Sequence, residues 1–161
     1  MIRATQVLKA GSWQAAPADR ITLSYDERHR RRLRYVAEAG TEFLLDLPRT
    51  MVLRGGDGLH LEDGRIILVT AAAEPLLEIR AGDADQLTRL AWHIGNRHLP
   101  AQITTGRILI REDSVIESML TGLGAAVRHV AEPFTPEPGA YDGSHAMLFA
   151  PGRSAHGHSH G

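Results

Sequence analysis

Two histidines, His93 and His98, lie within residues 91–100, at the end of a segment whose apolar spacing is typical of a helix. Pro100 follows them and should end that helix, because proline disfavours helical geometry in the residue before it. Neutral imidazole is a good ligand for Zn(II), Cu(II) and Ni(II). Both side chains are therefore candidate metal ligands, and His98 is the first candidate.

The helix is predicted over residues 83–98, with His98 continuing its buried apolar stripe. The other members of that stripe are Leu87, Leu90, Ala91 and Ile94. Each residue turns the helix by about 100°, so His93 points roughly 140° away from His98 and the two cannot hold one ion together. The competing interpretation is structural: His98 or Arg97 could cap the helix, since a cation is stabilised at its C-terminal end.

A second group of histidines lies near the C-terminal end, where His156, His158 and His160 alternate with glycine and serine. Residues 133–161 are rich in proline, glycine and polar residues and cannot bury enough apolar surface to offset their ordering entropy, so we predict a flexible tail. Three imidazoles on such a chain can wrap around a metal ion. His145 lies alone, and its spacing assigns it no role.

The composition restricts the chemistry. The 161-residue chain has no cysteine, so any metal must be held by nitrogen and oxygen ligands. It has no His-Glu-x-x-His motif or other set of three fixed ligands, which argues against an enzyme. The net charge of −1 argues against general affinity for nucleic acid. No run approaches the ~20 apolar residues of a membrane span, and no secretory signal is present, so we expect a cytoplasmic protein.

Residues 1–73 predict a small all-β domain without a helix. Short segments with near period-two alternation, at residues 21–25, 42–47, 58–62 and 65–70, read as strands. Asp63 and Gly64 predict a two-residue hairpin turn with positive φ at both positions. A short connector is expected near residues 71–75, because Pro75 favours an extended predecessor.

Residues 74–132 predict a second domain with the ferredoxin-like order βαββαβ. Its expected elements are a strand at 76–80, a helix at 83–98, a hairpin at 101–111, a helix from 114 and a strand at 126–130. Asp83 with Gln86, and Ser114 with Glu117, have the spacing of capping boxes that open the two helices. The fold class is therefore α+β, with a flexible histidine-containing tail.

An arginine-rich run spans residues 28–34. Beside a ferredoxin-like domain, such a run raises RNA binding as an alternative function. The strand at residues 107–111 carries no aromatic side chains to stack on bases, and an RNA-recognition domain would need them. We therefore interpret the run as a solvated hairpin rim or a docking patch for an acidic protein.

The Gly-Asn-Arg-His element at residues 95–98, joined to the histidine tail, resembles the urease accessory protein E family of nickel metallochaperones. The likeness covers nearly the whole chain and includes residues 47–49, 52–57, 62–65, 74–77 and 139–141 in the family's order. Some relatives carry further histidines where this chain has Glu112, Asp113 and Ser114, so those accessory sites are not expected here.

The resemblance implies a homodimer in which His98 of each subunit shares one ion near the two-fold axis. It also implies that His145 and the terminal histidines add ligands or collect nickel; His93 is a secondary candidate. The first domain would be akin to a peptide-binding module. The implied function is binding Ni(II) and delivering it, through the urease accessory GTPase and the apo-urease accessory complex, for urease active-site assembly. A general Zn(II) or Cu(II) buffer is the alternative, because imidazoles alone do not rank these metals.

Overall fold

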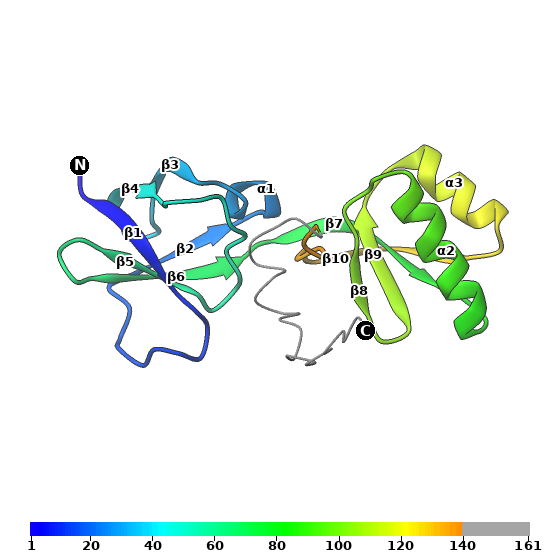
Figure 1. Ribbon diagram of the computed structural model, residues 1–161, viewed down its shortest axis with the longest axis horizontal. Coiled ribbons are helices and arrows are strands. Elements are labelled where there is room, and N and C mark those ends of the chain that lie inside the picture. The colour runs from blue at the N-terminus through cyan, green and yellow to red at the C-terminus, as the bar shows by residue number, and fades with distance from the viewer. Residues whose placement is uncertain (140–161) are drawn as a thin grey trace, which may run out of the picture.

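The computed structural model describes residues 1–139, which form two sheet-containing units of an α+β fold (Figure 1). The first unit contains β1 (Arg3–Leu8), β2 (Asp19–Leu23), α1 (Tyr25–Arg28), β3 (Arg32–Val36), β4 (Glu42–Asp46), β5 (Gly58–Leu61) and β6 (Ile66–Ala71). The second contains β7 (Ala73–Arg80), α2 (Ala84–Asn96), β8 (Gln102–Thr104), β9 (Arg107–Arg111), α3 (Ser114–Gly122) and β10 (Ala126–Pro133). No helix among these residues is long and apolar enough to cross a membrane.

The first unit is a six-stranded sheet with the order β2-β6-β5-β1-β4-β3. Its strands alternate buried and exposed residues, so one set of side chains forms the core, which includes Phe43, Leu45, Leu59 and Ile67. The predicted strands are confirmed, and β1 and β3 are additional. The connector predicted near residues 71–75 is wrong, because β7 begins at Ala73. Pro75 is accommodated there since it pairs with Ala131 of β10, while the pairing with β9 begins at Leu76.

Contrary to the prediction of no helix in the first unit, the short helix α1 follows β2. Ser24 caps it: its Oγ accepts a hydrogen bond from the Glu27 amide over 3.3 Å, and the Glu27 carboxylate accepts one from the Ser24 amide over 2.9 Å. A helix of four residues is too short to show apolar periodicity in the sequence. The capping pair was the signal that could have revealed it.

The turn between β5 and β6 has three residues rather than the predicted two. The Leu61 carbonyl accepts from the Gly64 amide, and the Leu61 amide donates to the Arg65 carbonyl, each over 2.9 Å. Gly64 has a φ of 92°, whereas Asp63 does not have a positive φ. The Asp63 carboxylate instead accepts from the Arg65 amide over 3.0 Å. A turn closed by one left-handed glycine needs positive φ at that single position.

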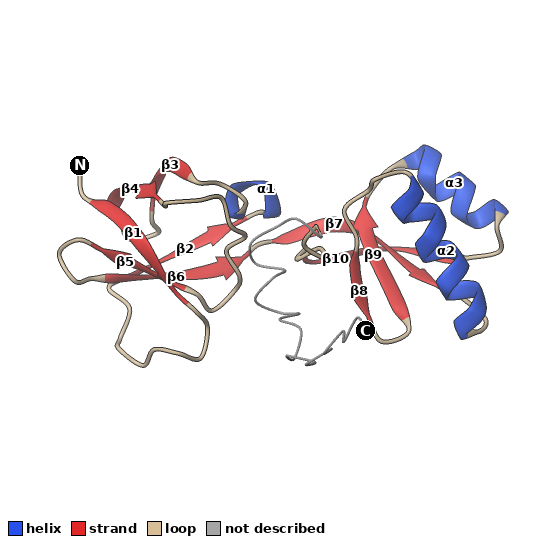
Figure 2. Ribbon diagram, viewed as in Figure 1, coloured by secondary structure: helices blue, strands red, loops and turns tan. Residues whose placement is uncertain are grey.

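The second unit is an antiparallel sheet with the order β10-β7-β9-β8, and α2 and α3 cover one of its faces (Figure 2). Asp83 caps α2 as predicted, accepting from the Gln86 amide over 2.7 Å. The predicted Ser114 cap of α3 is wrong. Asp113 is the cap, and its carboxylate accepts from the amides of Val115 and Ile116. Two adjacent residues of capping type made the register ambiguous.

The two units meet around Arg28, which is fully buried. Its guanidinium donates to the carbonyl oxygens of Leu23 and Leu53 in the first unit, and to the Phe134 carbonyl and Thr135 hydroxyl just after β10. The interpretation of residues 28–34 as a solvated rim is therefore wrong at Arg28, although the rest of the run is exposed. This arginine joins the units through main-chain acceptors.

Candidate metal centre

His98 lies just beyond the end of α2, in a left-handed conformation. The helix ends at Asn96 with Arg97 as its cap. The His98 amide donates to the Gly95 carbonyl over 3.0 Å, and the Leu99 amide donates to the Ile94 carbonyl over 3.5 Å. This is the pattern of a Schellman motif, with His98 at the position that usually holds glycine.

The prediction that His98 continues the buried face of the helix is wrong. Its φ of 57° turns the chain out of the helix, and its side chain is exposed. His98 is the only residue other than glycine with a positive φ among residues 1–139. The next residue, Leu99, packs instead against the apolar core under the helix. The motif therefore buries a leucine and presents an imidazole.

Local preferences are reversed at this helix end. Gly95 lies in the helix, where glycine costs roughly 1 kcal/mol relative to alanine. A Cβ at Gly95 would meet nothing within 4 Å, so packing inside this chain does not require a glycine there. At His98 a side chain occupies a conformation that costs about 1–2 kcal/mol for a residue with a Cβ. Such departures concentrate at functional sites.

The surface beside His98 is mainly apolar and hollowed. A cavity of about 160 Å³ is lined by Ala91, Ile94, Gly95, Leu99, Pro100, Ala101, Ile103, Ile108 and Glu137. Ile103, at its edge, is 52% exposed, and Trp92 on the same helix is 64% exposed. Large exposed apolar side chains near a hollow are typical of a contact surface.

His93 does not share the position of His98. It is half-buried within α2, and its ring meets the Trp92 ring edge-on with centroids 5.1 Å apart. His98 lies outside the helix, so the regular turn of 100° per residue does not extend to it. His93 thus belongs to the helix surface near Trp92, and its role as a secondary ligand stays a prediction.

The segment after β10 returns to the region of His98. The Thr135 amide donates to the Gln102 side-chain oxygen over 2.9 Å, and the Glu137 amide donates to the Ala101 carbonyl over 2.8 Å. Glu137 also lines the hollow described above. The predicted ligands His145, His156, His158 and His160 lie outside the described residues.

Residues 1–139 contain no group of three or more histidine, aspartate or glutamate side chains close enough to hold a metal ion. Within one chain His98 is therefore a single exposed imidazole and not a complete site. The described part of one molecule provides at most a fraction of a coordination sphere.

A third histidine, His129 on β10, forms a cluster that the sequence did not reveal. Its Nδ1 lies 2.7 Å from a Glu112 carboxylate oxygen, and its Nε2 lies 2.9 Å from a Glu117 oxygen. Glu112, and then Glu117, raise the pKa of His129 because both stabilise the imidazolium. Since carboxylates engage both ring nitrogens, this cluster has the geometry of an ion pair rather than that of a metal site.

Comparison with known proteins matches both units to one family. Residues 2–72 match the N-terminal domain of the UreE urease accessory protein, and residues 74–161 match its C-terminal domain. The chain belongs to the UreE urease accessory protein family. The resemblance inferred from the sequence is thus confirmed, as is the prediction that the chain is an accessory protein and not an enzyme.

Individual UreE relatives cover most or all of the chain. Urease accessory protein UreE of Bradyrhizobium sp. (strain ORS 278) is 60% identical over 147 residues, which is 91% of this chain and 70% of that protein. UreE of Rhodobacter capsulatus is 52% identical over 161 residues, covering 100% of this chain and 94% of that protein. UreE of Chelativorans sp. (strain BNC1) is 53% identical over 160 residues, 99% of this chain and 94% of that protein.

Proposed function

We propose that this UreE chain is a nickel carrier for urease maturation in the cytoplasm, binding Ni(II) through His98 and the histidines of residues 140–161. The observation that carries the proposal is the exposed imidazole of His98, held in a costly left-handed conformation at the end of α2. A family that assists urease, combined with imidazole donors and no thiolates, favours nickel as the cargo. Zn(II) and Cu(II) are the competing ions.

A two-fold dimer would supply the second ligand. Two copies packed at the C-terminal ends of α2 would bring two His98 side chains together without any further motif. The exposed Trp92 and Ile103 offer apolar surface for that contact, and Gly95 permits close approach of a second backbone. The β10-β7-β9-β8 strand order with both helices on one face supports a ferredoxin-like domain as the platform for this contact.

The tail would complete the coordination. Glu137 is hydrogen-bonded to Ala101, three residues after His98, so the chain leaves the described region beside the proposed site. Eight residues separate Glu137 from His145, and a fully extended chain of that length spans at most about 26–29 Å. His145 is therefore within chain reach of the hollow, and His156, His158 and His160 can collect further ions.

This arrangement suits carriage rather than storage. A site that is exposed and incomplete in one chain can exchange ligands stepwise, so the ion can leave for a partner. The partners that we propose are the urease accessory GTPase and the apo-urease accessory complex. Protonation of imidazole removes its ability to ligate, so nickel should be released as the pH falls through the histidine range.

Equilibrium nickel binding by the full chain and by a chain ending at Gly139 tests the role of the tail. Truncation is expected to lower the number of nickel ions bound per chain while retaining a site that depends on His98. A full-length chain with His156, His158 and His160 changed to glutamine is the matched control for the loss of chain length. An unchanged nickel count in both variants would overturn the proposed role of the tail.

A further inference from the structure

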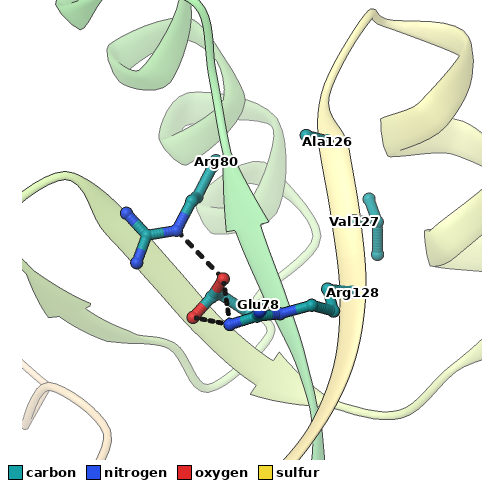
Figure 3. A pocket seen from close by; sticks show the side chains of 5 residues that line it. All are labelled: Glu78, Arg80, Ala126, Val127 and Arg128. Carbon is teal, nitrogen blue, oxygen red and sulfur yellow. Dashed lines mark hydrogen bonds and ion pairs between the residues drawn. The ribbon is translucent and has the colours of Figure 1, made fainter.

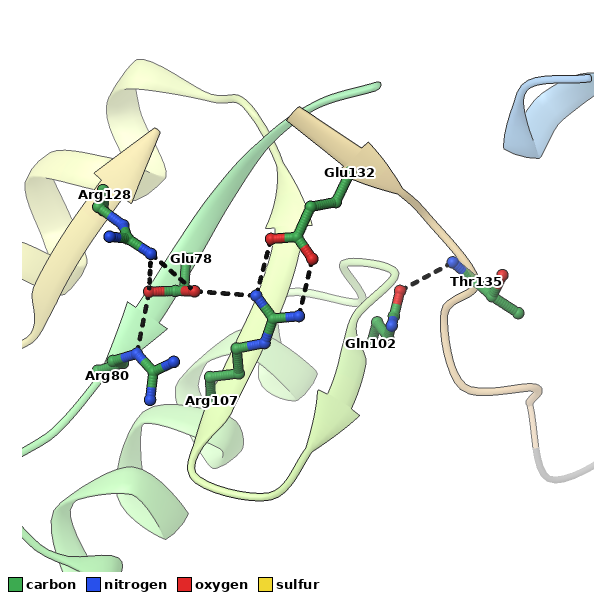
Figure 4. A network of polar contacts seen from close by, with 7 residues as sticks. All are labelled: Glu78, Arg80, Gln102, Arg107, Arg128, Glu132 and Thr135. Atoms are coloured by element: carbon green, nitrogen blue, oxygen red, sulfur yellow. Dashed lines mark hydrogen bonds and ion pairs between the residues drawn. The ribbon is translucent and has the colours of Figure 1, made fainter. Parts of the chain in front are cut away.

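The face of the second sheet opposite α2 and α3 carries a cluster of charged side chains around Glu78 (Figure 4). Glu78 is only 3% exposed, yet it lies on the sheet face without helices. Arg80 from the same strand, Arg107 from β9 and Arg128 from β10 surround its carboxylate. None of these residues belongs to the proposed metal site.

The contacts fix the three guanidinium groups. The Glu78 carboxylate accepts from Arg80 Nε and from Arg107 Nη1, each over 2.9 Å, and lies 3.2 Å from Arg128 Nη2. Arg107 also forms two hydrogen bonds of 2.8 Å with Glu132. The arginines, led by Arg80, hold the pKa of Glu78 to about 2, so its charge is present at neutral pH.

The cluster has more cationic capacity than its carboxylates use. Three guanidinium groups face two carboxylates, which leaves an excess of one positive charge. Each guanidinium has five N–H donors. Arg80 contacts Glu78 through Nε alone, and Arg128 through Nη2 alone, so the remaining donors of both are available among the described contacts. Both side chains are more than half exposed.

A hollow of about 330 Å³ lies at these two arginines (Figure 3). Its lining consists of Glu78, Arg80, Ala126, Val127 and Arg128. In Figure 3, Arg80 from β7 and Arg128 from β10 both extend toward the carboxylate of Glu78 between them. The buried glutamate thus orients two guanidinium groups in advance, and such groups match the geometry of a bound oxyanion.

We propose that this hollow binds a carboxylate side chain of an acidic segment on a partner protein. The site lies on the sheet face opposite α2, so a partner docked there leaves Trp92, Ile103 and His98 free for contact with a second copy. If the chain carries nickel as proposed above, the partner would be one that receives the ion. Binding at the hollow itself does not depend on nickel.

Charge distribution favours a protein carboxylate over nucleic acid. A continuous phosphate backbone crossing this face would pass Glu132 as well as Glu78, and both repel it. No aromatic ring lines the hollow, so bases would have no stacking surface there. An isolated carboxylate needs only the Arg80 and Arg128 donors.

Titration of the full chain with a short oligoglutamate peptide, followed by NMR of the arginine Nε–H groups, tests the inference. The peptide should shift the Arg80 and Arg128 signals, and the R80Q/R128Q variant should bind it roughly tenfold more weakly, since each surface ion pair contributes up to about 1 kcal/mol. The R20Q/R89Q variant removes the same charge from exposed arginines elsewhere and should bind within about twofold of the wild type.

Three further arms make the outcome specific. R80K/R128K keeps the charge but loses the planar donors, so intermediate binding is expected. Inorganic phosphate or single-stranded RNA binding the arginines more tightly than the peptide would overturn the assignment to a protein carboxylate, as would equal peptide binding by R80Q/R128Q. Unchanged nickel binding by R80Q/R128Q is expected, and it separates this site from the proposed nickel function.

Discussion

The backbone amide of Glu137 donates a 2.8 Å hydrogen bond to the carbonyl oxygen of Ala101, so the segment after the last strand lies beside the end of α2. These residues are far apart in sequence, and Ala101 is three residues from His98. The contact anchors the beginning of the C-terminal segment next to the exposed imidazole. It is the structural basis for proposing that histidines on the two segments serve one ion.

The left-handed conformation of His98 predicts an unusual order of stability. His98→Gly should have a free energy of unfolding higher than that of His98→Ala by roughly 1 kcal/mol, because only glycine adopts this φ without steric cost. Both variants lack the imidazole and should lose the tightest nickel site equally. Urea unfolding of the metal-free proteins measures the difference.

Arg97 provides the matched control for that comparison. Its φ of −95° is accessible to alanine, so Arg97→Ala should be at least as stable as Arg97→Gly, the reverse of the order at position 98. Equal stability of the glycine and alanine variants at position 98 would show that the conformation there imposes no cost.

Arg28→Met should lower the free energy of unfolding by about 3 kcal/mol. The substitution leaves buried carbonyl oxygens of Leu53 and Phe134 without the guanidinium that now donates to them. Thermal or urea unfolding provides the measurement. Arg30→Met, which removes an exposed arginine with one hydrogen bond to the Asp26 carbonyl, should change stability by less than about 0.5 kcal/mol. Similar effects of the two substitutions would contradict the role given to Arg28.

Glu78 predicts a specific loss of stability in acid. Its pKa falls from 4.5 to about 2 in the folded protein, so it contributes stability above pH 4.5 that disappears as the pH falls toward 2. The contribution at neutral pH is roughly 2–3 kcal/mol. In Glu78→Gln the stability should therefore change less steeply between pH 5 and 2, a window set by those two pKa values.

Urea titrations across this pH range compare the two proteins. Part of the acid sensitivity should persist in Glu78→Gln, because backbone hydrogen bonds, led by the one from Ala39, also lower the pKa of Asp19 to about 2. Identical pH dependence in wild type and Glu78→Gln would contradict the ionised state of Glu78 in the cluster.

The sequence predicted those features that depend on local pattern. Alternation predicted the central strands, and the spacing of Asp83 and Gln86 predicted the start of α2. The exposed position of His98 could not be predicted by extending the helical stripe, because one residue of left-handed conformation ends that periodicity. A Gly-Asn-Arg-His-Leu-Pro segment before a proline contained the end of the helix but did not fix its last residue.

Features built from distant residues were not predictable from periodicity. Arg28 belongs to an arginine-rich run, and only the fold shows that its acceptors include Phe134, more than a hundred residues away. Glu78 stands within an apolar strand, and its guanidinium partners on β9 and β10 become neighbours only through strand pairing. Their charges alone gave no indication of which arginines would meet this carboxylate.

The most direct test of the central claim is the stoichiometry of the tightest nickel site, measured by equilibrium binding together with sedimentation. If two His98 side chains share one ion, the tightest site should hold one nickel per two chains, nickel should favour the dimer, and His98→Ala should lose both properties. Retention of that site and of the metal-linked dimer in His98→Ala would contradict the shared site.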